Sequence, residues 1–178
     1  MSTAASPRSS ETFTGACVVM GVASCGKTTV GEAIAARLGV PFIEGDRLHA
    51  PESIAKMSAG IPLTDDDRWP WLARIGSAMR GQTGIAAACS ALKKSYRQAI
   101  AQAAARPVVF VFLSGTRELL AARIAARKGH FMPPTLLDSQ LATLQPPDGS
   151  EPHVTLDLGL PPDELVARAI GYLTEGRT

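Results

Sequence analysis

The segment from Gly21 to Thr28, with the sequence GVASCGKT, has the residue types and the spacing of a loop that binds phosphate groups. It matches the pattern G-x-x-x-x-G-K-[ST], in which glycines let the backbone curl so that successive N–H groups face an anion. In such a loop Lys27 brings a full positive charge to the β- and γ-phosphates of a nucleotide, and the Thr28 hydroxyl can bind magnesium. The whole loop is therefore a candidate ATP site, and its members are Gly21, Val22, Ala23, Ser24, Cys25, Gly26, Lys27 and Thr28.

Cys25 lies inside this loop, directly before an expected helix. The positive end of a helix stabilises a thiolate, so the sequence predicts a lowered thiol pKa, slow alkylation of the free protein and protection by bound ATP. The alternative interpretation is a small residue that simply fits the loop.

Two acidic residues follow the second expected strand, in the segment Glu44-Gly45-Asp46. Open α/β sheets bind their ligands at the carboxyl ends of the strands. Glu44 and Asp46 are therefore candidates for contact with magnesium or for accepting a hydroxyl proton. A solvated turn with a charged edge would show the same pattern.

Basic residues recur four positions apart in two helix-like stretches, a spacing that places side chains on one helix face. Lys93 and Arg97 follow the third strand and would present two cations to an anionic acceptor. Arg123 and Arg127 would reach over the γ-phosphate, where they stabilise its charge and help to exclude water. Solvated surface cations, or cations that complement a helix C-terminus, are the alternative interpretation.

Arg68 has an unusual position in the expected helix that follows Thr64. Thr64 and Asp67 have the spacing of a capping box and predict the start of that helix. Arg68 then falls in the first turn, where a cation opposes the helix dipole. We therefore expect a partner or a ligand beside Arg68.

Short apolar segments alternate with helix-like stretches, a pattern typical of a parallel sheet wrapped by helices. The expected strands are Ala16 to Met20, Pro41 to Glu44, Ile85 to Cys89, Val108 to Leu113 and His153 to Leu156. Helices are expected from Lys27 to Leu38, with Gly39 as the stop, and after Pro161 and Pro162. The fold class is thus α/β, a five-stranded parallel sheet between helices with the phosphate loop, the strand-end acids and the basic residues at one edge.

The composition fits one globular domain from residue 16 to residue 178, preceded by a loose tail of residues 1–15. The chain has 178 residues, 46% of them hydrophobic, and a formal charge of +2. A chain this close to neutral is not expected to bind nucleic acid, and no apolar run approaches the roughly 20 residues that cross a membrane. The three cysteines contain no CxxC pair, which argues against disulfides and zinc sites and favours the cytoplasm.

Several separated segments match, in order, those of one known family. They are Met20-Gly21-Val22 at the loop, Glu44-Gly45-Asp46 with Leu48-His49, Lys56-Met57 with Gly60-Ile61-Pro62-Leu63, Asp65-Asp66-Asp67-Arg68 with Pro70-Trp71-Leu72, Cys89-Ser90-Ala91-Leu92-Lys93-Lys94 with Tyr96-Arg97, Arg127-Lys128-Gly129-His130-Phe131, and Ser139-Gln140 with Leu144. From about Val18 to Leu173 the chain resembles the small bacterial-type gluconokinases, which are related in fold to shikimate and nucleoside monophosphate kinases.

This resemblance implies a P-loop kinase fold with a mobile lid at about residues 123–135. It also implies the transfer of the γ-phosphoryl group of ATP, with Mg²⁺, to the 6-hydroxyl of D-gluconate, which gives 6-phosphogluconate and ADP. Relatives suggest a homodimer.

The resemblance assigns roles to individual residues as well. Asp46 would receive or orient the hydroxyl proton, Lys27 and Arg127 would complete the catalytic set, and Arg123 would join Arg127 over the phosphates. Thr28 and Glu44 would contact the metal. The residues that would hold the sugar acid are Asp46, His49, Arg68, Lys93, Arg97 and His130.

Three departures from the family pattern stand out. The family usually has Gly-Ser-Gly where this chain has Ser24-Cys25-Gly26, so Ser24 must adopt a conformation that glycine takes more easily. Glu44 replaces an aspartate, which shifts the expected metal contact by one bond. Gln145 stands where the family commonly has Glu, so any role of a charge there is lost.

Two other functions remain open. The first is a related small-acid kinase such as shikimate kinase, although a glycine triplet would then be expected in place of Cys89-Ser90-Ala91. The second is a nucleotide-binding module without catalytic activity, against which the intact Lys27, Thr28 and Asp46 argue. No guanine-reading N-K-x-D motif is present.

Overall fold

A parallel five-stranded sheet organises the chain, with the strands in the order β2-β3-β1-β4-β5. The computed structural model describes residues 12–126 and 134–175, and all structural statements refer to these residues. The strands are β1 (Ala16–Met20), β2 (Phe42–Glu44), β3 (Ile85–Ala88), β4 (Val109–Ser114) and β5 (His153–Asp157). The strand that leads into the phosphate loop, β1, is therefore the central one.

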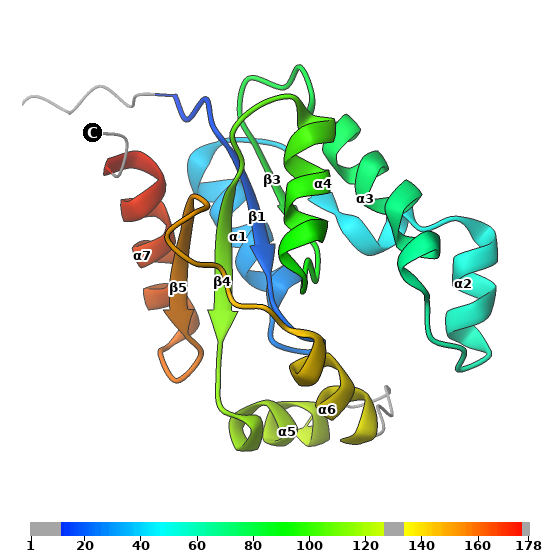
Figure 1. Cartoon of the computed structure of the whole chain (residues 1–178). Helices are drawn as coiled ribbons and strands as arrows, with labels where there is room; N and C mark the ends of the chain where they lie inside the picture. Colours follow the sequence, from blue (N-terminus) through cyan, green and yellow to red (C-terminus); the bar gives the residue numbers. More distant parts are fainter. Residues whose placement is uncertain (1–11, 127–133, 176–178) are drawn as a thin grey trace, which may run out of the picture.

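Helices cover both faces of this sheet (Figure 1). On one face lie α3 (Asp65–Met79) and α4 (Lys94–Ala104), and on the other lie α1 (Lys27–Leu38) and α7 (Pro162–Glu175). The short helices are η1 (Gly45–Leu48), α2 (Pro51–Ser58), α5 (Arg117–Ala126) and α6 (Pro134–Thr143). Helices α5 and α6 lie beyond the carboxyl end of β4 (Figure 1). Within the described ranges, no helix is long and apolar enough to cross a membrane.

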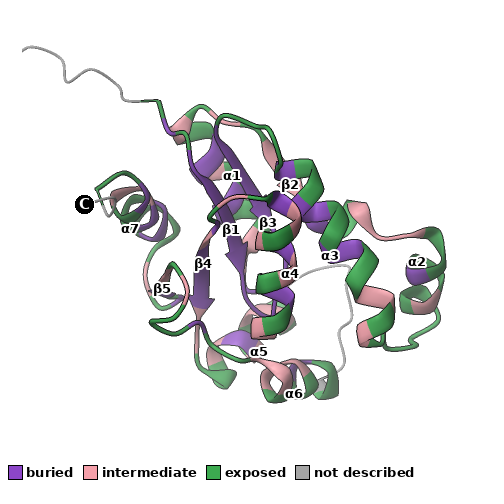
Figure 2. Ribbon diagram, turned by 45° about the horizontal axis from the view of Figure 1, so that its top comes forward, coloured by how far each residue is buried: buried purple, intermediate pink, exposed green. Residues whose placement is uncertain are grey.

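The side chains of β1 alternate between two hydrophobic cores, one on each face of the sheet. Cys17 and Val19 belong to the core under α1 and α7, whereas Val18 and Met20 belong to the core under α3 and α4. Figure 2 shows the result, a sheet buried at its centre and helices exposed on their outer faces. Because both faces are covered, the strands carry the continuous apolar runs seen in the sequence.

The predicted elements agree closely with the structure. The bounds of β1 and α1 are those expected. Three other strands differ from the predicted bounds by one residue at one end, and β4 differs by one residue at both ends. Gly39 ends α1 with a left-handed φ of 66°, as its position predicts. The α/β fold with a parallel five-stranded sheet is thereby confirmed.

The predicted tail extends too far along the chain. Phe13 is buried in the hydrophobic core, and Gly15 accepts a backbone hydrogen bond from Ile85 at the start of β3. Burial of Phe13 and the backbone hydrogen bond of Gly15 therefore hold residues 12–15 against the domain. Four residues are too few to be recognised from the sequence as a strand. Residues 1–11 lie outside the described residues.

Helices α3 and α4, near whose starts two predicted substrate residues lie, are closely packed against each other. A Cβ atom on Gly76 of α3 would lie 2.4 Å from the carbonyl oxygen of Ile100 on α4, so only glycine fits. Arg68, near the start of α3, and Lys93, which caps α4, both lie close to the ring of Tyr96 on α4.

Candidate active site

The phosphate loop has the strained backbone that the sequence predicts. Gly21 and Gly26 have φ angles of 147° and 97°, and Ser24 has a left-handed φ of 61°. The expectation that Ser24 must accept a glycine-like conformation is thereby confirmed. Gly26 caps α1 without a side-chain acceptor, so the first N–H groups of that helix are available to an anion.

Side chains hold the peptide between Val22 and Ala23 on both sides. The ammonium group of Lys27 donates a 2.9 Å hydrogen bond to the Val22 carbonyl. The Ala23 N–H donates a 2.6 Å hydrogen bond to the side-chain oxygen of Gln140, on α6. Only the match of Ser139-Gln140 to a family segment had pointed to this residue.

Arg123 lies against the loop from α5. Its guanidinium donates to the Leu158 carbonyl at 2.8 Å and to the Cys25 carbonyl at 3.5 Å. This places the cation at the loop where an ATP contact was predicted. Arg127 and His130, and most of the predicted lid, lie outside the described residues.

The predicted acidity of Cys25 is wrong. Its side chain is fully buried, and this burial raises the pKa of the thiol even though Lys27 and Arg123 oppose the shift. The thiol packs so closely under Gly21 that a Cβ atom there would lie 2.8 Å from Sγ. Cys25 is therefore a packing residue of the loop, which is the alternative interpretation.

Glu44 connects the start of α1 with the segment that carries Asp46. One carboxylate oxygen accepts a 2.5 Å hydrogen bond from the Thr28 hydroxyl, and the other accepts a 3.4 Å bond from the Asp46 N–H. Hydroxyl and carboxylate oxygens are the ligands that Mg²⁺ prefers, so this donor set fits the predicted metal. Among residues 12–126 and 134–175, no group of three or more His, Cys, Asp or Glu could hold a metal ion. Thr28 and Glu44 are the described residues that would hold a magnesium ion.

The segment that carries Asp46 is fixed by packing. Trp71 donates its indole N–H to the Gly45 carbonyl at 2.8 Å, and a Cβ atom on Gly45 would lie 2.3 Å from the Ala88 carbonyl. His49 stacks on Trp71 with the ring centroids 4.0 Å apart. Asp46 itself is exposed at the end of the sheet.

His49 lies within the electrostatic reach of two other predicted site residues. Burial lowers the pKa of His49, the carboxylate of Asp46 opposes this shift, and the guanidinium groups of Arg68 and Arg74 reinforce it. The buried Nδ1 atom of His49 has no hydrogen-bond partner among the described residues. Asp46 and Arg68 therefore lie near enough to His49 to influence its charge, and the contact of these three residues with substrate stays a prediction.

Lys93 and Arg68 meet around the ring of Tyr96. Their cationic groups lie 5.3 Å and 5.8 Å from its centroid. Lys93 also contacts both carboxylate oxygens of Asp65, at 2.8 and 2.9 Å, and the Tyr96 hydroxyl donates to the same carboxylate at 2.5 Å. These bonds lower the pKa of Asp65. The position beside Lys93 is therefore occupied by a carboxylate of the protein itself.

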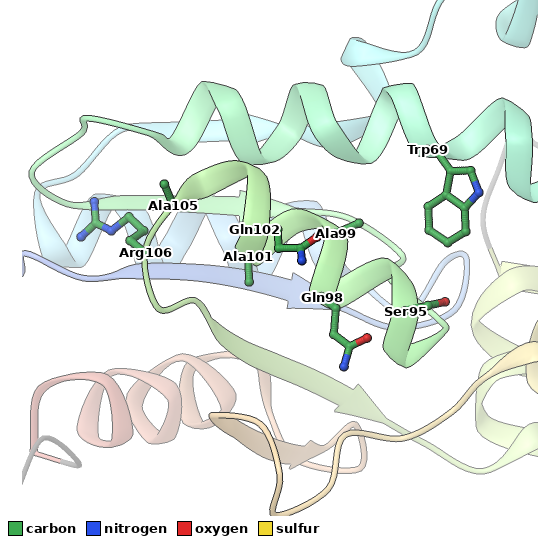
Figure 3. Close-up of a pocket in the computed structure, with 8 residues that line it drawn as sticks. All are labelled: Trp69, Ser95, Gln98, Ala99, Ala101, Gln102, Ala105 and Arg106. Carbon is green, nitrogen blue, oxygen red and sulfur yellow. The ribbon is translucent and has the colours of Figure 1, made fainter.

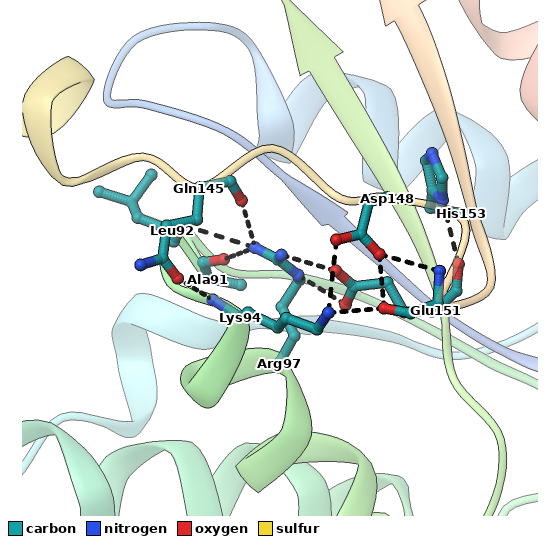
Figure 4. Close-up of polar contacts among 9 residues, drawn as sticks. Ala91, Leu92, Lys94, Arg97, Gln145, Asp148, Glu151 and His153 are labelled. Carbon is teal, nitrogen blue, oxygen red and sulfur yellow. Dashed lines mark hydrogen bonds and ion pairs between the residues drawn. The ribbon is translucent and has the colours of Figure 1, made fainter.

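Arg97 has a different environment from the one expected. Its side chain is 1% exposed, and its guanidinium is paired with Glu151 through bonds of 2.6 and 2.8 Å (Figure 4). The remaining donors reach the carbonyls of Ala91, Leu92 and Gln145. Lys93 is the N-cap of α4 and has an extended backbone, so the shared helical face expected for Lys93 and Arg97 does not exist.

A groove of about 790 Å³ runs along the outer face of α4 (Figure 3). Its lining residues are Trp69, Ser95, Gln98, Ala99, Ala101, Gln102, Ala105 and Arg106. None of the predicted site residues lines this groove. Trp69, which lines the groove, meets Tyr96 edge-on with the ring centroids 5.5 Å apart, and Tyr96 is the ring that Lys93 and Arg68 approach.

The central β1 strand, the phosphate loop that follows it and the strand-end carboxylates together define a P-loop kinase. Residues 17–147 match the model of an AAA domain family. A shikimate kinase from Aquifex aeolicus shares the fold, with a TM-score of 0.56 at 13% identity, and it covers 90% of this chain while this chain covers 96% of it.

Proteins with higher sequence identity show to which family of P-loop kinases the chain belongs. A gluconokinase from Gluconobacter oxydans is 46% identical over 159 residues, which is 87% of this chain and 89% of that protein. The thermosensitive gluconokinase of Escherichia coli is 43% identical over 77% of this chain and 75% of its own length. The crystal structure of a gluconokinase from Sinorhizobium meliloti superposes with a TM-score of 0.85 at 52% identity, covering 92% of this chain and 93% of that one. The chain belongs to the gluconokinase family, as the resemblance predicts.

Proposed function

We propose that the protein transfers the γ-phosphoryl group of ATP to the 6-hydroxyl of D-gluconate, giving 6-phospho-D-gluconate and ADP. Family membership supports the reaction and the acceptor. The observation that carries the mechanism is the bridge that Glu44 makes between Thr28 at the phosphate loop and Asp46 at the next strand end. This bridge supports the proposed role of Asp46 at the acceptor hydroxyl, because it joins the backbone of Asp46 to a residue that contacts the phosphate loop.

In the proposed reaction the gluconate hydroxyl oxygen forms a bond to the γ-phosphorus, and the bond from that phosphorus to the β–γ bridging oxygen breaks. Asp46 takes the hydroxyl proton, a role that typically contributes about 10²- to 10⁴-fold in rate. Lys27, the loop N–H groups and the N-terminus of α1 bind and orient the phosphates. Arg123 adds a cation from α5, and Arg127 remains the predicted second one.

Thr28 and Glu44 are the residues that would hold Mg²⁺. When bound, the metal neutralises charge on the β- and γ-phosphates. Glu44 also accepts a hydrogen bond from the Asp46 backbone N–H, so the same side chain contacts the backbone of the residue that carries the proposed base.

Lys93 and Arg68 are the proposed cations for the carboxylate and hydroxyls of gluconate. Lys93 is already paired with Asp65, and an incoming carboxylate therefore competes with an internal one. His49, packed on Trp71, contributes a neutral ring because burial lowers its pKa. His130 stays a prediction, and the enclosed Arg97 is proposed to support the loop before α4 and not to contact substrate.

The direct test is ADP release from ATP and Mg²⁺ with D-gluconate, with shikimate, or with no acceptor. We expect stimulation by gluconate alone, and none in the Lys27→Ala variant, which controls for contaminating kinases. Equal release without an acceptor would contradict phosphoryl transfer to gluconate. Stimulation by shikimate would contradict the acceptor and leave the kinase class intact.

A further inference from the structure

The two contacts on the Val22–Ala23 peptide act on the same rigid plane. Lys27 binds its carbonyl oxygen, and Gln140, 117 residues beyond Ala23 in the chain, binds its N–H. The C=O and N–H groups of a trans peptide point in opposite directions and rotate together. Gln140 therefore fixes the direction of the carbonyl that holds Lys27.

The orientation of the Gln140 amide follows from chemistry. A backbone N–H can only donate, so the group that faces it must be the side-chain oxygen. The 2.6 Å contact is part-buried, which shields it from competing water.

Helix α6, which carries Gln140, is held by contacts outside the phosphate loop. Leu137 on α6 is buried in the hydrophobic core, and Arg117 on α5 holds Asp138 on α6 through hydrogen bonds of 2.6 and 3.0 Å. The position of Gln140 is thus set by packing outside the phosphate loop.

The consequence concerns the donors of Lys27. An ammonium group has three N–H donors, and one of them goes to the Val22 carbonyl. This leaves two donors with a set direction for the oxygens of the β- and γ-phosphates. If the peptide turned, Lys27 would lose that orientation and would have to be ordered when the nucleotide binds.

We propose that Gln140 is a positioning residue of the nucleotide site, which acts on Lys27 through the Val22–Ala23 peptide. This inference rests on the proposed function only in requiring that the loop binds ATP. It assigns to α6 a part in phosphate binding without any contact between Gln140 and the substrate.

The test is a double-mutant cycle on ATP affinity, measured by calorimetry with the full chain. Gln140→Met removes the acceptor at similar length, and Lys27→Ala removes the group on which it acts. We expect Gln140→Met to weaken ATP binding about tenfold in the parent and less than twofold in the Lys27→Ala background. The matched control is Gln98→Met on the exposed face of α4, which should change neither value. An equal loss in both backgrounds, or no loss in the parent, would overturn the proposal.

A second variant covers the case in which Gln140→Met does not fold. Gln140→Asn keeps the amide but shortens the side chain by one methylene group, which withdraws the oxygen from the Ala23 N–H and should leave Lys27 without its set direction toward the β- and γ-phosphates. Its affinity loss should increase from AMP to ADP to ATP, and affinities equal to those of the parent would contradict the proposal. Failure of the parent itself to bind ATP would overturn both this inference and the proposed function, whereas binding without coupling overturns this inference alone.

Discussion

The Thr28 hydroxyl donates a 2.5 Å hydrogen bond to the carboxylate of Glu44, a residue that lies 16 positions later in the chain. The bond joins the first turn of α1, the helix that follows β1, to the end of β2, and β3 separates these two strands in the sheet. It is possible because parallel strands deliver their carboxyl ends to one edge. The glutamate, which is one bond longer than the family's aspartate, still reaches the hydroxyl.

The first prediction concerns the charge of Glu44. Glu44→Gln retains an acceptor for Thr28 but removes the charge that suits Mg²⁺. We expect the Mg²⁺ concentration for half-maximal activity to rise at least fivefold, with kcat lower than that of the parent. Glu44→Asp keeps the charge, and its half-maximal Mg²⁺ concentration should lie between those of the parent and Glu44→Gln. A magnesium titration that is identical for all three proteins would contradict the metal role.

The second prediction concerns Asp46. Asp46→Asn removes the proposed proton acceptor while leaving the phosphate loop untouched, so ATP affinity should change less than twofold and turnover should fall at least tenfold. Asp66→Asn, an exposed position on α3, makes the same chemical change elsewhere. Steady-state turnover and ATP binding would be measured on both. Full activity in Asp46→Asn would remove this residue from the mechanism.

Residues near the phosphate loop were predictable because their chemistry follows local patterns. The loop motif gives the position of Lys27 and Thr28, and the end of β2 gives Glu44 and Asp46. Two predictions were wrong because they applied local rules alone. The dipole argument for Cys25 ignored burial, which dominates its pKa, and the spacing argument for Lys93 and Arg97 assumed one residue more of helix than α4 has.

The contacts that the sequence did not reveal join segments far apart in the chain. Gln140 and Ala23 are 117 residues apart, and Arg97 and Glu151 are 54 apart. Neither pair has a periodicity or a motif that specifies its partner. Such contacts are set by how the layers pack, and an amide or an arginine gives the same local signal whether it is exposed or enclosed.

The third prediction concerns the buried pair of Arg97 and Glu151. Glu151→Ala leaves an enclosed guanidinium without its counter-ion, and loss of one partner of a buried pair typically costs about 3–5 kcal/mol. Denaturant unfolding should show a decrease of this order in the free energy of unfolding. The exposed pair of Glu164 and Arg168 on α7 is the control, because Glu164→Ala should cost less than about 1 kcal/mol. Similar costs at both sites would contradict a structural role for Arg97.

The fourth prediction follows from the lowered pKa of His49. Below its ordinary pKa of 6.5, the unfolded chain binds a proton at His49 while the folded chain resists it. The unfolded state therefore holds more protons there, and the stability of the fold falls as the pH drops below 6.5. The negative charge of Asp46 opposes this effect, whereas the positive charges of Arg68 and Arg74 strengthen it. Thermal unfolding between pH 7.5 and 5.5 should show a smaller decrease in Tm for His49→Gln than for the parent. The same decrease in both proteins would exclude His49 as a source of the pH dependence.

The last prediction concerns Gln145, where the family commonly has a glutamate. Its side-chain oxygen accepts a 2.8 Å hydrogen bond from the Lys94 N–H, so it caps the N-terminus of α4 from outside the helix. Lys93, the N-cap residue itself, makes no side-chain cap, and the first turn of α4 has no acidic residue. Gln145→Glu would place a negative charge at the positive end of the dipole, which typically stabilises a helix by about 0.3–1 kcal/mol. We expect a small rise in Tm that shrinks as salt increases, because the added interaction is electrostatic and exposed. A decrease in Tm at low salt would mean that the cap requires the amide and not only its oxygen.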